Sequence, residues 1–140
     1  MSNRTFYNEI LIDHNSHPYH KKVLEDADIV LEGVNPSCGD DIWLQLKVKE
    51  DKIEDAAFYG SGCAISQASA DLMIDLILGR SKSEALTYIE LFYDMIQGKL
   101  TEEEMEQLEE ASCLRDISHM PARVKCAVLS WHTLETMIQN

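Results

Sequence analysis

The sequence predicts an α+β fold: a three-stranded antiparallel sheet with about five helices packed on one side of it. Residues 28–59 contain three apolar runs separated by polar turns, and the middle run alternates with the period of two that is typical of a half-buried strand. From residue 63 onward the apolar residues recur at helical spacing instead. Most of the helices are therefore expected to follow the sheet along the chain.

Composition limits both the size of the fold and the kind of partner. The 140 residues suit a single domain spanning 1–140, and 45% hydrophobic residues are enough for a sizeable core. A net charge of -13 argues against nucleic acid and favours docking on a basic protein. No signal peptide or membrane-spanning run is evident, so we expect a cytoplasmic protein without a membrane partner.

The first element is a short amphipathic helix, predicted from the helical spacing of Phe6, Tyr7, Ile10, Leu11 and His14. Pro18 ends this region. His14, His17 and His20 form a candidate metal site, but they lie in a loop broken by proline, which favours a solvated turn.

The strands come next. We expect them at Asp28–Val34, Ile42–Val48 and Ile53–Tyr59. The last two are joined by the polar turn Lys49–Lys52, and strands joined so closely pair antiparallel.

Four helical segments follow the sheet. Glycines at 79 and 98 end the first two, which start at Cys63 and Ser81, and capping-box patterns begin the helices at Ser81 and Thr101. The third carries the charge run Glu102–Glu110, which is predicted to be a solvated face. Whether this face also binds a partner is an open alternative. The last begins near Pro121 and extends to Ile138.

Three of the four cysteines lie at element boundaries. Cys38 and Asp40 flank Gly39, Cys63 follows a Gly-Ser-Gly break at a helix N-terminus, and Cys126 lies in the first turns of the last helix. Thiols in a reducing compartment favour metal or sulfur chemistry over disulfides. Cys113 lacks such a context and is predicted to be a small buried hydrophobe.

Three thiolates and one carboxylate match the four ligands that Zn²⁺ takes. Spacing alone leaves open the alternative of scattered structural cysteines, because the chain lacks paired Cys-x2-Cys knuckles. Asp40 is a hard ligand among soft sulfurs, and such a ligand exchanges readily. A site built only for stability would gain nothing from it, so we favour a working site.

Three stretches resemble the cysteine motifs of the IscU/NifU family of iron–sulfur cluster assembly proteins. They are Gly33–Asp40, Phe58–Ser66 and Pro121–Cys126, and Tyr7–His14 resembles the family's first helix. Lys125 replaces a histidine of the scaffold branch, and an additional acidic helix, about Leu91 to Glu110, intervenes. Both departures resemble the zinc-binding SufU branch. His17–Lys21 departs from the family's usual sequence, so docking contacts of the family are not carried over to this stretch.

The resemblance implies zinc as the cofactor, with Cys38, Asp40, Cys63 and Cys126 as its ligands. It further implies that Cys38 accepts persulfide sulfur from a SufS-type cysteine desulfurase, with Asp40 setting the lability of the site. Downstream iron–sulfur assembly proteins would be further partners. One alternative is a scaffold that binds iron or a 2Fe–2S cluster, and another is a structural zinc domain with an acidic docking surface.

Overall fold

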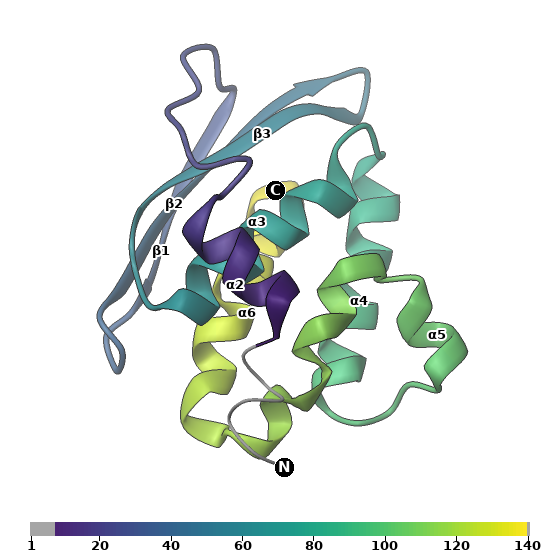
Figure 1. Cartoon of the computed structure of the whole chain (residues 1–140). Coiled ribbons are helices and arrows are strands. Elements are labelled where there is room, and N and C mark those ends of the chain that lie inside the picture. Colours follow the sequence, from purple (N-terminus) through teal and green to yellow (C-terminus); the bar gives the residue numbers. More distant parts are fainter. Residues whose placement is uncertain (1–7, 140) are drawn as a thin grey trace.

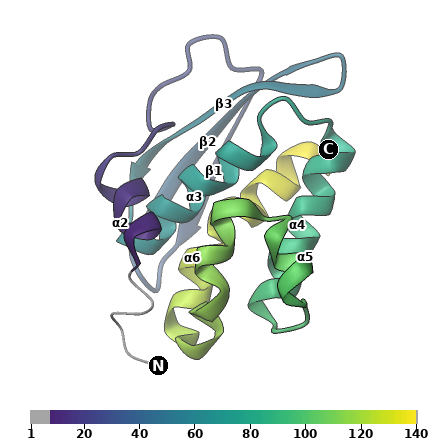
Figure 2. The same ribbon diagram turned by 45° about the vertical axis from the view of Figure 1, so that its right-hand side comes forward.

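The structure, a computed structural model, describes residues 8–139. The sheet forms one layer, and the helices lie together on one side of it (Figures 1 and 2). The elements, in chain order, are α2 (Glu9–Ser16), β1 (Ile29–Asn35), β2 (Asp40–Lys49), β3 (Lys52–Ser61), α3 (Ala64–Ile77), α4 (Lys82–Ile96), α5 (Glu102–Glu106), the 3-10 helix η1 (Glu109–His119) and α6 (Pro121–Gln139).

The sheet has the order β1-β2-β3, and both neighbouring pairs are antiparallel. Leu44 of β2 pairs with Leu31 of β1 and with Phe58 of β3. The inner side chains Ile42, Leu44 and Leu46 are at most 1% exposed. The predicted sheet is confirmed, with each strand extending at most two residues beyond the range expected from the sequence.

The helical layer is centred on α3 and α6. Trp131 of α6 stacks on Phe92 of α4 with ring centroids 4.0 Å apart. The Trp131 indole N–H also donates to Ser69 Oγ on α3 at 2.9 Å, and Ser69 donates to the carbonyl of Ala127 at 2.6 Å. Buried polar groups thus fix α3 and α6 against each other, which positions the helix segments that carry Cys63 and Cys126.

The predicted acidic helix from about Leu91 to Glu110 is wrong as a single element. α4 ends at Ile96 and Gly98 takes the left-handed φ of 74°, which L residues disfavour. Thr101 caps the next helix, as expected, but α5 has only five residues. The charge run of residues 102–110 is largely exposed, as predicted.

The segment after α5 continues as a 3-10 helix, which the sequence could have indicated. Its buried residues recur every third position, at Leu108, Ala111, Leu114 and Ile117. Three residues per turn is the 3-10 repeat, whereas an α-helix needs 3.6.

Within residues 8–139, none of the helices is long and apolar enough to cross a bilayer. Phe6 and Tyr7 of the predicted first helix lie outside the described residues.

Candidate metal centre

Three chain segments converge at one end of the sheet. β1 ends at Asn35 and β2 starts at Asp40, so Cys38 lies on the turn that joins them. Gly39 has a φ of 70° on this turn, a conformation that glycine adopts without strain. Cys63 follows β3 and is the N-cap of α3, as predicted, and Cys126 lies in the second turn of α6.

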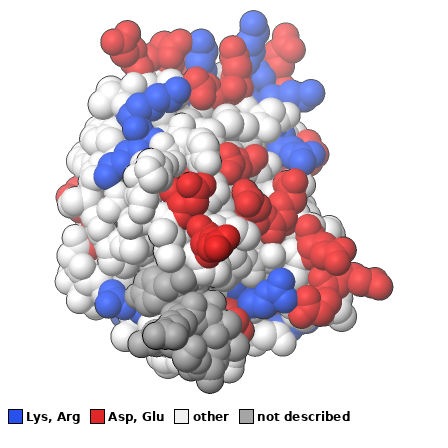
Figure 3. Space-filling model, viewed as in Figure 1, with Lys and Arg blue, Asp and Glu red and all other residues white. Residues whose placement is uncertain are grey.

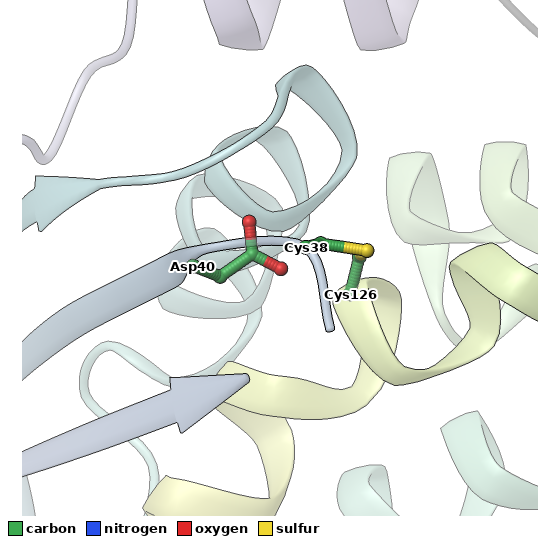
Figure 4. Close-up of side chains that lie close together, drawn as sticks. All are labelled: Cys38, Asp40 and Cys126. Atoms are coloured by element: carbon green, nitrogen blue, oxygen red, sulfur yellow. The ribbon is translucent and has the colours of Figure 1, made fainter. Parts of the chain in front are cut away.

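The structure brings three of the four predicted ligands into one tight group. Ligand atoms of Cys38, Asp40 and Cys126 all lie within 4.8 Å of one another. In Figure 4 the sulfur atoms of Cys38 and Cys126 lie next to each other, with the Asp40 carboxylate beside them. Cys63 is outside that triple. It is joined to the group through its backbone, because its N–H donates to Asp40 Oδ1 at 2.9 Å.

Asp40 is fully buried and extensively hydrogen-bonded. Its Oδ1 accepts from the Cys63 backbone N–H at 2.9 Å and from the Ser66 hydroxyl at 3.0 Å. Its Oδ2 accepts from the Asn35 amide at 3.1 Å. Burial alone would raise the pKa of this carboxyl, but donors from Cys63, Cys126, Asn35 and Ser66 outweigh burial and lower the pKa. The carboxylate is therefore ionised at neutral pH.

The two thiols beside Asp40 have different surroundings. Cys126 is 0% exposed, and burial, reinforced by the neighbouring thiols and carboxylate, raises its pKa far above the usual value. Cys38 is only partly buried. Its sulfur lies 3.9 Å from Nη1 of Arg123 and 3.8 Å from the carbonyl of Ala122. Through this contact the Arg123 guanidinium donates a long, weak hydrogen bond to the Cys38 sulfur.

Sequence reasoning assigned no role to Asn35, Ser66 or Arg123, although all three lie in the motifs around the cysteines. Gly62 leaves room for the hydrogen bonds of Asp40. A Cβ at this position would collide with the Ser66 hydroxyl and approach Asp40 Oδ1 to 2.9 Å. The short spacing of Ser66 from Cys63 on one helix was the available signal. It is a weak one, because serine is common in the first turn of helices.

Cys113 lies apart from this group, in η1, and packs partly buried against the core. Burial raises its pKa to about 12, so its thiol is protonated and unreactive at neutral pH. This agrees with the prediction of a buried hydrophobe.

The three early histidines do not form one site. The His17 side chain is 81% exposed, whereas His14 is buried. The solvated-turn interpretation holds for His17 and Tyr19, which are exposed, but not for His14. The turn is anchored through its backbone, because the buried Asp71 carboxylate accepts from the N–H groups of Tyr19 and His20 at 3.1 and 2.8 Å.

Comparison with known proteins shows which family this chain belongs to. The family model for the NifU-like N-terminal domain matches residues 6–140. The chain belongs to this family. Within it, the chain is 44% identical over 131 residues to the zinc-dependent sulfurtransferase SufU of Bacillus subtilis, covering 94% of this chain and 88% of that protein.

Two further proteins are also similar to this chain. The iron–sulfur cluster assembly scaffold protein IscU of Streptococcus pyogenes is 41% identical over 134 residues, which cover 96% of this chain and 83% of that one. The crystal structure of the protein called FiSufU, from Fervidobacterium islandicum AW-1, superposes with a TM-score of 0.89 at 38% identity, covering 98% of this chain and 99% of that one. The IscU/SufU-like fold predicted from the motifs is thus confirmed.

Proposed function

We propose that this protein takes part in iron–sulfur cluster assembly, as a zinc-dependent acceptor of sulfur from a cysteine desulfurase. The observation that carries the proposal is the convergence of Cys38, Cys126 and Asp40 within 4.8 Å. It is supported by the 44% identity to the Bacillus subtilis relative, which is named a zinc-dependent sulfurtransferase. A single thiol could accept sulfur, but a set of thiols sharing one carboxylate suits metal-dependent chemistry.

Cys38, Asp40, Cys63 and Cys126 would hold the zinc ion. Their donor set fits it, because three thiolates and one carboxylate complete a tetrahedral site. When bound, Zn²⁺ keeps coordinated thiols deprotonated at neutral pH. The raised pKa of Cys126 fits this requirement, since a thiol this deeply buried ionises only beside a cation.

Cys38 is the residue that accepts sulfur. It lies on a turn next to Gly39, is partly exposed, and has the Arg123 guanidinium beside its sulfur. The Cys38 sulfur attacks the terminal sulfur of a cysteine persulfide on the desulfurase. A new S–S bond forms at Cys38, the S–S bond of the donor breaks, and the donor cysteine leaves as a thiolate. One persulfide replaces another, so no oxidant or reductant is consumed.

Asp40 is the exchangeable ligand. An oxygen donor among sulfurs binds zinc less tightly than a thiolate does. Its hydrogen bonds from Cys63, Ser66 and Asn35 stabilise the carboxylate even without a metal partner. If zinc were bound, Asp40 would be able to leave it without becoming an uncompensated buried charge.

A donor cysteine must be able to reach Cys38. A pocket of about 350 Å³ lies beside the turn that carries it, lined in part by Pro36, Ser37 and Lys125. A segment of the desulfurase could enter there. The net charge of -13 favours a partner with a basic docking surface.

Replacing Cys38 tests this function. The Cys38→Ala variant should no longer stimulate cysteine turnover by a SufS-type desulfurase. Cys113→Ala is the matched control, because its thiol lies outside the site, and it should stimulate as well as the unchanged protein. Undiminished stimulation by Cys38→Ala would contradict the proposal.

A second candidate function is that of a scaffold on which a 2Fe–2S cluster is built and handed on. The 41% identity to the Streptococcus pyogenes protein, named as a scaffold, favours it, and the same thiols suit iron. Anaerobic reconstitution followed by visible absorption and transfer to an apo-acceptor separates the two. A transferable cluster supports the scaffold, whereas its absence together with stimulated desulfurase turnover supports the sulfur acceptor.

A further inference from the structure

A second group of metal-ligating side chains lies on α2, α3 and η1, outside the cysteine site. It consists of one ring nitrogen of His14 and one carboxylate oxygen each from Asp75 and Glu110, all within 4.8 Å of one another. His14 comes from the last turn of α2, Asp75 from α3 and Glu110 from the start of η1. Acidic side chains gather in the middle of this face of the molecule (Figure 3).

The His14 ring has a fixed orientation. It is 2% exposed, and its Nδ1 lies 2.6 Å from Oδ2 of Asp71, which is itself 0% exposed. The same carboxylate accepts from the backbone N–H groups of Tyr19 and His20. Asp71 therefore holds the Nδ1 side of the ring, and Nε2 is the nitrogen that faces Asp75 and Glu110. Metal-binding histidines are oriented by a carboxylate in this way.

The spacing around Nε2 is that of ligands around a shared ion. Nε2 lies 3.6 Å from Oε1 of Glu110 and 4.0 Å from Oδ2 of Asp75. Both distances are too long for a hydrogen bond. Two ligands about 2.0–2.2 Å from one zinc ion at the tetrahedral angle lie about 3.3–3.6 Å apart, so small side-chain movements would complete the site.

Asp75 is also held by a residue that does not belong to the group. Nε2 of His20 lies 2.6 Å from the other oxygen of Asp75, Oδ1. One carboxylate oxygen is thus engaged by His20, while Oδ2 faces His14. Both His14 and Asp75 consequently have a partner that orients them, which is the pattern of a metal ligand with its supporting shell.

The charge and access of the group suit a cation. In residues 8–139, the ion pairs of Asp71, Asp75 and Glu110 all involve histidines rather than lysine or arginine. A pocket of about 260 Å³, lined in part by Asp75, Glu109 and Glu110, opens beside the carboxylates. An ion could enter from solvent through this pocket, and its remaining coordination position would be filled by water.

We infer that His14, Asp75 and Glu110 form a second metal site, which takes a divalent transition ion of the zinc class through one imidazole nitrogen and two carboxylate oxygens. Imidazole selects against Mg²⁺ and Ca²⁺, which prefer all-oxygen sites. Its donors contain no sulfur, so this site is chemically distinct from the cysteine site. It joins the α2 end of the chain to α3 and η1.

Zinc titration of the metal-free protein against a chromophoric chelator tests this inference. The unchanged protein should bind two equivalents, the second more weakly. Glu110→Gln and Asp75→Asn should each weaken the second equivalent by at least about tenfold and leave the first unchanged. Their side chains are 61% and 42% exposed, so both variants should fold. Glu109→Gln, which lines the same pocket without belonging to the group, is the matched control and should keep both equivalents.

A spectroscopic measurement distinguishes the two sites. Co²⁺ added to protein that already carries one equivalent of Zn²⁺ should produce weak visible bands without the near-ultraviolet sulfur-to-metal absorption of a thiolate site. A strong sulfur band for the second ion, binding of one equivalent in total, or equal weakening in Glu109→Gln would overturn the inference. Two equivalents that persist in both Glu110→Gln and Asp75→Asn would overturn it as well.

Discussion

Replacing Ser66 with alanine should weaken zinc binding although Ser66 is not one of the proposed ligands. Its hydroxyl donates to Asp40 Oδ1 at 3.0 Å, and both residues are 0% exposed. A hydrogen bond to a charged acceptor contributes about 1.5–3 kcal/mol. Part of that contribution is present with and without the metal, so the lower end of the range applies to binding. We expect the zinc dissociation constant to rise by about tenfold, and by at most about a hundredfold.

Ser69 provides a matched control for this prediction, one turn further along α3. It is equally buried, accepts from the Trp131 indole and donates to the Ala127 carbonyl, but does not contact Asp40. Ser69→Ala should therefore lower the free energy of unfolding by about 1–3 kcal/mol and leave zinc affinity nearly unchanged. Chelator competition and urea unfolding of both variants measure the two effects. An unchanged dissociation constant in Ser66→Ala, or an equal loss of affinity in Ser69→Ala, would show that the Ser66 hydroxyl does not support Asp40 as a zinc ligand.

Three further predictions concern the same region and its surroundings. Gly62→Ala should abolish tight zinc binding, because the added Cβ would displace side chains of the site. At Gly39 an added Cβ meets no atom within 4 Å, so Gly39→Ala should cost only about 1 kcal/mol of stability for its φ of 70°. Chelator competition measures zinc binding in both variants, and urea unfolding measures their stability. Arg123→Ala should slow alkylation of Cys38 in metal-free protein, followed by mass spectrometry, and an unchanged rate would remove the proposed role of the guanidinium. The raised pKa of Cys113, about 12 in the folded state, contributes stability that is fully present below about pH 8.5 and is lost as pH rises towards 12. Above about pH 8.5 the free energy of unfolding should therefore fall less steeply with pH in Cys113→Ala than in the unchanged protein. The difference in slope should reach at most about 1.4 kcal/mol per pH unit.

The sheet and the position of the cysteines followed from local sequence signals. Alternation along Ile42–Val48 predicts a half-buried strand, and the Gly-Ser-Gly break before Cys63 predicts the start of α3. Both signals act over a few residues, so they are readable without tertiary information. The same period-two pattern left Gln45 facing solvent, yet it is buried, because its amide bonds the backbone of Lys22 and Leu24.

The support around Asp40 could not be predicted in the same way. Asn35 and Ser66 become partners of one carboxylate only because β1, β2 and α3 end at the same place. The change from α5 to the 3-10 helix at Glu109 was also missed, because only the longer run Leu108, Ala111, Leu114 and Ile117 shows the three-residue repeat. The group of His14, Asp75 and Glu110 draws on residues far apart in sequence, and only the fold brings them together.

The most direct test of the proposed function is to locate transferred sulfur on the chain. Zinc-loaded protein would be incubated with a SufS-type desulfurase and cysteine, its thiols trapped by alkylation, and its peptides analysed by mass spectrometry. One added sulfur atom is expected, on the peptide that carries Cys38. Sulfur found mainly on Cys63, Cys126 or Cys113, or no added sulfur while desulfurase turnover is stimulated, would contradict the proposed function.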